Sequence, residues 1–225
     1  MDLLVVVEIV SVVLAFLLAR VMTKPYRTLE DSRYLALPLG FVFLGFSYVF
    51  MGASFLLTTP SGIERAKWLH LFTGAYAFAF LAITYYISSK RPEREVRPFI
   101  LGLITFSFLL LVFFIVVLFL PPFLAIPDYK VADEYFRLFN MLMALYVTFS
   151  TLRVHLATLE PKTVFAPFAY ALLAFSQYSL LLWSVDSSYS AFLGAHILRL
   201  FSLLVFLYIS YAPRFSKNSS QVGHV

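Results

Sequence analysis

The chain has 225 residues, of which 61% are hydrophobic and only 13% charged, and its formal net charge is +5. A water-soluble domain of this length needs a larger charged fraction to cover its surface, so the composition excludes that class and predicts an integral membrane protein. The absence of cysteine excludes disulfides, thiolate catalysis and cysteine-ligated metals. The scarcity of cysteine, asparagine and glutamine suits a thermophilic source, although membrane proteins in general are also poor in polar residues.

Seven apolar segments are long enough to be membrane-spanning helices, because a hydrocarbon core about 30 Å thick needs about 20 apolar residues per helix. In chain order they are Leu3–Met22, Leu35–Leu57, Trp68–Ser88, Phe99–Leu120, Tyr135–Leu156, Val164–Val185 and Tyr189–Tyr211. We therefore expect an all-α integral membrane protein with one seven-helix domain over residues 1–212 and a short cytoplasmic tail over 213–225.

The loops on one predicted side of the membrane carry most of the basic residues, which places that side in the cytoplasm. The N-terminus is then outside and the C-terminus inside, as in a multi-pass protein of the plasma membrane. This asymmetry accounts for the net charge, so we expect the lipid bilayer as a partner and no nucleic acid. The basic residues on the predicted cytoplasmic side are Arg20, Lys24, Arg27, Arg33, Lys90, Arg91, Arg94, Arg97, Arg153, Lys162, Arg214 and Lys217.

An internal duplication relates the first three segments to the last three. A shift of 126 positions places His70 on His196, and a shift of 129 positions places Pro38 on Pro167. The first and fifth segments agree more weakly, at a shift of 133 positions. Shifts that change only in the loops are what a duplication followed by loop insertions leaves behind.

The duplication predicts three helices, a linker helix and three more helices. Repeat one covers 1–88, the linker helix 99–120 and repeat two 134–212. A single linker helix makes the two triplets parallel, related by a pseudo-twofold axis along the membrane normal. The linker segment is almost uniformly apolar, so much of its surface should face lipid.

This 3+1+3 arrangement resembles the broad class of seven-helix membrane proteins that includes microbial rhodopsins and the sugar-transporting SWEET proteins. The last segment lacks the retinal-binding lysine of the rhodopsins, which excludes a retinal Schiff base there. Neither Pro38 nor Pro167 is followed by the glutamine of SWEET repeats. The His-x-x-Arg spacing of His196 and Arg199 is similar to seven-helix input domains of archaeal membrane sensors.

Polar side chains inside membrane helices usually face the bundle interior and mark a functional centre. With the predicted orientation, those of this chain lie in the outer half or near the middle of the membrane, where they could form one cluster that opens to the outside. The small residues Thr73 and Gly74 beside His70 permit either close helix packing or space for a ligand. The polar residues are Glu8, His70, Asn140, Gln177, His196 and Arg199.

A buried arginine in the last segment requires a counter-charge. Glu8 is the only acid placed inside any predicted segment, so we expect it to pair with Arg199. Two interpretations of this pair remain open. It either locks the bundle together with Asn140 and Gln177, or it belongs to a pocket that binds a charged or polar ligand from outside.

Two further functions remain open. His70 and His196 could ligate one haem b iron from opposite sides, with Arg199 near a propionate and Gly74 making room for the ring, as in a membrane electron carrier. A zinc site built from Glu8 and the two histidines is less favoured, because no second acid is present to act as a base. Alternatively, Pro38 and Pro167 could act as hinges in a small-solute transporter.

The sequence contains no phosphate-binding loop, nucleophile elbow or acid pair facing a common site, which favours a non-enzymatic protein. The predicted function is therefore a ligand-binding or sensory membrane component with a polar pocket in its outer half. A sensory role requires a membrane or cytoplasmic signalling partner, because the tail is too short to signal by itself.

Overall fold

A computed structural model describes residues 2–29, 36–90, 93–119, 128–159 and 161–219. The secondary structure of this part of the chain is entirely helical. The helices are α1 (Asp2–Leu29), α2 (Ala36–Leu56), α3 (Pro60–Lys90), α4 (Glu93–Phe119), α5 (Tyr129–Thr158), the short 3₁₀ helix η2 (Pro161–Val164), α6 (Phe165–Asp186) and α7 (Tyr189–Ser219).

Six of the helices are long and apolar enough to cross a membrane, and α4 contributes a shorter apolar stretch, Leu101–Val116. Their outward faces carry large exposed hydrophobic side chains, such as Ile9, Phe149 and Phe201. Exposed apolar surface on this scale suits a lipid environment. The chain is therefore a multi-pass, all-α membrane protein, whereas the predicted orientation and the choice of membrane stay predictions.

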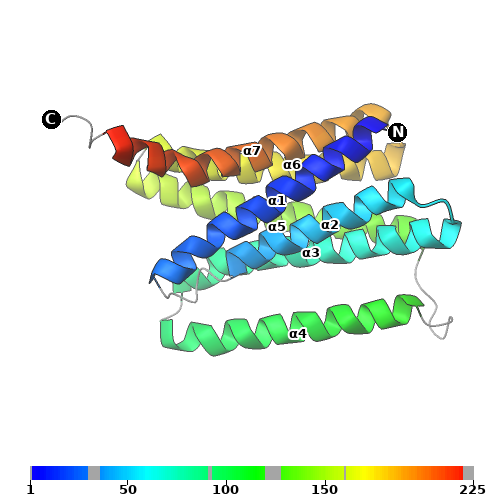
Figure 1. Ribbon diagram of the computed structural model, residues 1–225, viewed down its shortest axis with the longest axis horizontal. Coiled ribbons are helices and arrows are strands. Elements are labelled where there is room, and N and C mark those ends of the chain that lie inside the picture. Colours follow the sequence, from blue (N-terminus) through cyan, green and yellow to red (C-terminus); the bar gives the residue numbers. More distant parts are fainter. Residues whose placement is uncertain (1, 30–35, 91–92, 120–127, 160, 220–225) are drawn as a thin grey trace.

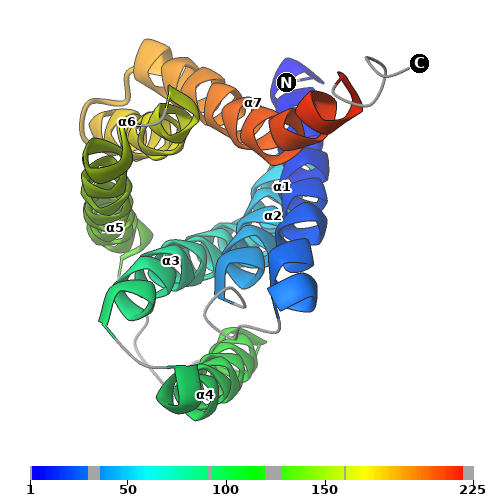
Figure 2. The ribbon, with the colours of Figure 1, turned by 90° about the vertical axis from the view of Figure 1, so that its left-hand side faces the viewer.

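Six helices form a closed ring, and α4 lies outside it (Figure 2). Around the ring, α1 packs on α2, α2 on α3, α3 on α5, α5 on α6, α6 on α7, and α7 closes the ring on α1. The helices run along one common direction (Figure 1). Helix α4, the predicted linker, packs against α3, where Phe114 stacks on Phe72, and most of its described side chains are exposed.

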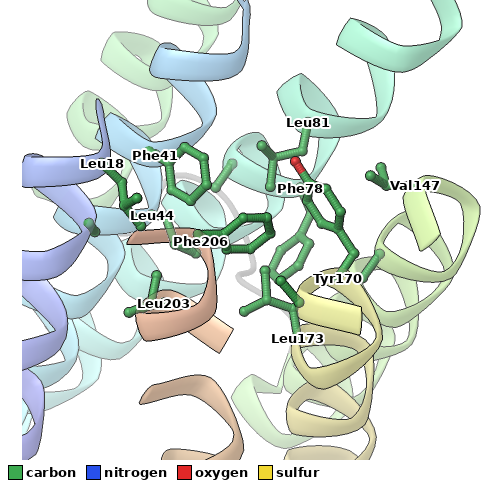
Figure 3. Close-up of a cluster of buried hydrophobic side chains, with 14 of the residues drawn as sticks. Leu18, Phe41, Leu44, Phe78, Leu81, Val147, Tyr170, Leu173, Leu203 and Phe206 are labelled. Carbon is green, nitrogen blue, oxygen red and sulfur yellow. The ribbon is translucent and has the colours of Figure 1, made fainter. Parts of the chain in front are cut away.

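An apolar cluster fills one half of the ring interior, toward the ends where α2 and α6 begin (Figure 3). Phe206 of α7 lies at its centre and makes edge-to-face contacts with Phe41 of α2 and Tyr170 of α6. Such packing is a main source of stability inside a membrane, where lipid tails are as apolar as the side chains. Labelled members of the cluster are Leu18, Phe41, Leu44, Phe78, Leu81, Val147, Tyr170, Leu173, Leu203 and Phe206.

Helix α5 begins at Tyr129, six residues before the expected start at Tyr135. The side chain of Asp128 caps it by accepting a hydrogen bond from the backbone N–H of Lys130 at 3.1 Å. The early start brings charged residues into the helix that the sequence had assigned to a loop. The Pro-rich sequence between the fourth and fifth segments falls largely on residues 120–127, outside the described part.

The two equivalent prolines lie near the beginnings of their helices. Pro38 is the third residue of α2, and Pro167 is the third residue of α6. In the first turn a proline removes no intrahelical hydrogen bond, because those N–H groups have no partner within the helix. The positions of Pro38 and Pro167 therefore give no support to the hinge prediction.

Gly40 lies at a close contact between α2 and α3. A Cβ atom at Gly40 would lie 2.8 Å from Cδ2 of the buried Leu81 and 3.3 Å from the backbone oxygen of Ala77. We expect Gly40→Ala to destabilise the protein by about 1–3 kcal/mol, as for other overpacked cores. Thermal unfolding in detergent measures this, and Gly102→Ala is the matched control because nothing lies within 4 Å of its Cβ position. Equal melting temperatures for the two variants would contradict this account of the α2–α3 contact.

Candidate ligand-binding site

Ten polar or charged side chains form a layer across the ring, which we call the polar layer. It lies on the opposite side of the ring interior from the apolar cluster, within about three helical turns of the ends where α1, α3, α5 and α7 begin and α2 and α6 end. Every one of the six ring helices contributes. The polar layer consists of Glu8, Ser47, Tyr48, His70, Asp133, Arg137, Asn140, Gln177, His196 and Arg199, all of them buried.

Arg199 of α7 pairs with Glu8 of α1, which confirms the predicted ion pair. Nη2 of Arg199 donates to Oε1 of Glu8 at 2.7 Å. Nε2 of His196 lies 3.1 Å from the same oxygen but is not aligned for a hydrogen bond. The ring of Tyr48 lies 4.3 Å from the guanidinium carbon of Arg199, a cation–π contact. The arginine charge is thus offset by a carboxylate and an aromatic face.

A second buried ion pair lies within α5. Arg137 donates from Nε to Oδ2 of Asp133 at 2.9 Å, and its Nη2 lies 2.9 Å from Oδ1 of the same residue. This two-pronged geometry is the strongest that arginine makes with a carboxylate. The expectation that Glu8 is the only acid within the helices was wrong, because α5 starts earlier than predicted. The i, i+4 spacing of the two residues was the signal that could have found the pair.

His70 binds α2 to α3 through Ser47. Ser47 Oγ donates to the carbonyl oxygen of His70 at 3.0 Å, and Nδ1 of His70 lies 2.8 Å from Ser47 Oγ and 3.0 Å from the Ser47 carbonyl oxygen. The neighbouring Thr73 donates to the backbone of its own helix, at Leu69 O. The side chains of His70 and Thr73 are therefore both held by protein groups.

Asn140 of α5 spans the gap between Gln177 of α6 and Gly74 of α3. Its Nδ2 donates to Oε1 of Gln177 at 3.4 Å. A Cβ atom on Gly74 would lie 3.7 Å from that Nδ2 and 3.2 Å from Ser47 Oγ. The glycine therefore leaves space at the centre of the polar layer.

This space is a small enclosed cavity of about 10 Å³. A volume of this size holds about one water molecule or one monatomic ion. Arg137 and Arg199 both line it, whereas their carboxylate partners Glu8 and Asp133 do not. The remaining lining residues are Leu44, Ser47, Tyr48, His70, Leu71, Gly74, Phe78, Asn140, Gln177 and Leu180.

Two buried polar atoms on residues of this lining have no hydrogen-bond partner within the described residues: Nε of Arg199 and Oδ1 of Asn140. An unpaired buried polar atom costs about 1–3 kcal/mol, so a cluster serving packing alone should satisfy both. One donor and one acceptor are therefore free for a bound species.

The structure brings most of the predicted site residues together. His70, Gly74, Asn140, Gln177 and Arg199 line one cavity. Glu8 is linked to this lining through its ion pair with Arg199, and His196 lies next to Glu8. Thr73 is buried but is not part of the lining. Sequence reasoning missed Ser47, Tyr48 and Arg137. Serine and tyrosine are common in apolar segments, so the first two carried no distinguishing signal.

The two histidines do not fit axial ligation of a haem. Both nitrogens of His196 face protein acceptors, with Nδ1 2.7 Å from the carbonyl oxygen of Phe192 and Nε2 3.1 Å from Glu8 Oε1. Nδ1 of His70 is engaged by Ser47. A cavity of about 10 Å³ is far too small for a porphyrin. Among the described residues, no group of three or more histidine and acidic side chains has the geometry for a metal ion.

Comparison with family models, with curated proteins and with solved structures finds no match for this chain. The resemblance to rhodopsins, SWEET proteins and archaeal sensors therefore stays a prediction from topology.

Proposed function

We propose that the protein binds a small anion in the polar-layer cavity and serves as a receptor-like component of its membrane, without catalysing a reaction. One observation carries the proposal. The two buried arginines of the polar layer line the same enclosed space, and the carboxylate that neutralises each one lies outside that lining.

The charge distribution explains why an anion is favoured. Each arginine is part of a buried ion pair, so neither enters the membrane interior as a lone charge. Toward the cavity, however, the walls present guanidinium, amide and hydroxyl groups and no carboxylate. Nε of Arg199 supplies a free donor for the anion.

Binding is better supported than transport. The apolar cluster around Phe206 closes the half of the ring beyond the polar layer, and neither Pro38 nor Pro167 lies where it could bend a helix. A receptor needs access from one side only. In the predicted orientation that side is the outside of the cell.

The predicted duplication fits this proposal. A pseudo-twofold axis that exchanges α1 with α5, α2 with α6 and α3 with α7 also exchanges the α3–α5 contact with the α7–α1 contact, and both contacts occur in the ring. At the α7–α1 interface Arg199 pairs with Glu8, and at the α3–α5 interface Gly74 faces Asn140. An anion held between the triplets would favour one packing of the triplets over another. A signalling partner could respond to that change in packing.

Anion binding is tested by thermal unfolding of the purified protein in gluconate buffer, with chloride or bromide replacing gluconate at constant ionic strength. A ligand at about 100 times its Kd stabilises the folded state by about 2.7 kcal/mol, so we expect a saturable rise in melting temperature. Arg199→Lys keeps the charge but loses the Nε donor, and should weaken the response about tenfold.

Arg153→Lys is the matched control, because Arg153 is exposed on α5 and should leave the response unchanged. An equal melting temperature in gluconate and in both test anions would refute the proposal, and so would an undiminished response of Arg199→Lys.

A further inference from the structure

A second cavity, of about 320 Å³, opens on the outer face of the ring between α1 and α2. Its walls are almost wholly aliphatic, and Ile9, Val13 and Val49 on its rim are exposed on the lipid-facing surface. A volume near 300 Å³ is at the lower end of the range for small-molecule sites. We call it the α1–α2 groove.

One buried carboxylate breaks the apolar character of the α1–α2 groove. Glu8 is among its lining residues and is only 1% exposed. Its Oε1 accepts a hydrogen bond from Arg199 and lies 3.1 Å from Nε2 of His196, but its Oε2 has no hydrogen-bond partner among the described residues. A carboxylate oxygen left unpaired in an apolar setting is costly, so a hydrogen-bond donor reaching it from the groove is strongly favoured.

Gly52 keeps the way to Glu8 open. A Cβ atom at Gly52 would touch the Glu8 stem, at 3.4 Å from Cβ and 4.0 Å from Cγ. A longer side chain at this position would occupy part of the groove beside Glu8. The lining thus combines an apolar channel, a small residue and a single acceptor.

From this combination we propose that the α1–α2 groove binds a bilayer lipid with a neutral hydroxyl head group, whose O–H donates to Oε2 of Glu8 and whose chain lies along the aliphatic walls. Charge selects the head group. Glu8 and Arg199 already balance one another, so an ammonium would add an uncompensated charge inside the membrane. A phosphate would place its negative charge next to the carboxylate of Glu8, and the two would repel. A hydroxyl supplies the missing donor without changing the net charge.

The groove and the polar-layer cavity are separate sites. Tyr48 lines both, and the Glu8–Arg199 pair lies between them. The lipid proposal uses Oε2 of Glu8, whereas the anion proposal uses Nε of Arg199. Either proposal can therefore fail while the other holds.

The lipid proposal is tested by photolabelling the protein in nanodiscs with hexadecanol that carries a diazirine next to the hydroxyl group. We expect cross-links concentrated on the α1 and α2 peptides that contain Glu8 and Gly52. Unlabelled hexadecanol should compete at concentrations about tenfold lower than hexadecane, the advantage of one hydrogen bond to a carboxylate. Hexadecyltrimethylammonium should compete no better than hexadecane.

Gly52→Leu should reduce the labelling of α1 and α2 about tenfold by filling the groove, while leaving the chloride response of the polar-layer cavity intact. Gly102→Leu on the lipid-facing side of α4 is the matched control, because nothing lies within 4 Å of its Cβ position. Labelling spread evenly over all lipid-facing helices, undiminished labelling of Gly52→Leu, or equal competition by hexadecane and hexadecanol would overturn the proposal.

Discussion

Replacement of Arg199 by leucine should destabilise the folded protein by about 3–5 kcal/mol, the typical cost of leaving one partner of a buried ion pair uncompensated. Without Arg199, the carboxylate of Glu8 remains 1% exposed in the ring interior, and His196 is the one basic group of the described residues left within ion-pair distance. The change also removes the charged contact between α1 and α7, where the ring closes. Unfolding in mixed micelles with increasing denaturing detergent measures the loss.

The double variant Glu8→Leu/Arg199→Leu separates the contribution of the ion pair from that of side-chain packing. It should recover much of the stability, because two apolar side chains carry no desolvation cost. Arg153→Leu, at an exposed position of α5, is the control and should change stability by no more than about 0.5 kcal/mol. If Arg199→Leu were as stable as the control, Glu8 and Arg199 would not be the buried pair described here.

Replacement of Asp133 by alanine should lower the free energy of unfolding by about 3–5 kcal/mol for the same reason. Arg137 is 2% exposed, and among the described residues its ionic contacts are all with the Asp133 carboxylate. Both residues belong to α5, so the loss comes from an unpaired charge and not from a broken link between helices. The same detergent titration measures it.

Asp186→Ala provides the comparison, because Asp186 is exposed at the end of α6 and should show a change below about 0.5 kcal/mol. Equal stability of the two variants would mean that Arg137 reaches water or lipid head groups and is not enclosed in the polar layer.

The Glu8–Arg199 pair could be predicted because a membrane leaves few alternatives. A charge inside a long apolar segment needs a partner, and the predicted segments contained only one acid. The prediction that the polar residues form one cluster used the alternating direction of successive helices. Residues early in α1 and α7 and late in α6 reach the same depth when the helices alternate.

The beginning of α5 could not be predicted from hydropathy. Asp133 and Arg137 lower the mean hydropathy of this turn and make it resemble a loop, although each cancels the charge of the other within the helix. Hydropathy scales count residues singly and so miss neutral pairs. The capping aspartate at position 128 was the available signal for the earlier start.

The cavity itself also lay beyond prediction. The sequence shows that Gly74 is small, but not that Asn140 and Ser47 converge on it from two other helices. Likewise, the aligned Pro38 and Pro167 suggested hinges, and only the helix bounds show that both lie in a first turn. Contacts between helices depend on how each helix is rotated about its own axis. An apolar segment that faces lipid on one side and protein on the other specifies this rotation only weakly.

The most direct test of the anion site is X-ray diffraction at the bromine absorption edge from crystals grown in bromide. A bound bromide would give an anomalous peak in the polar-layer cavity, within contact distance of Nε of Arg199 and near Arg137, and the peak would be lost in Arg199→Lys. The crystals should contain bromide at a concentration that saturates any rise in melting temperature. A cavity that holds only water under these conditions would contradict the proposal. The polar layer would then serve only to hold the six-helix ring together.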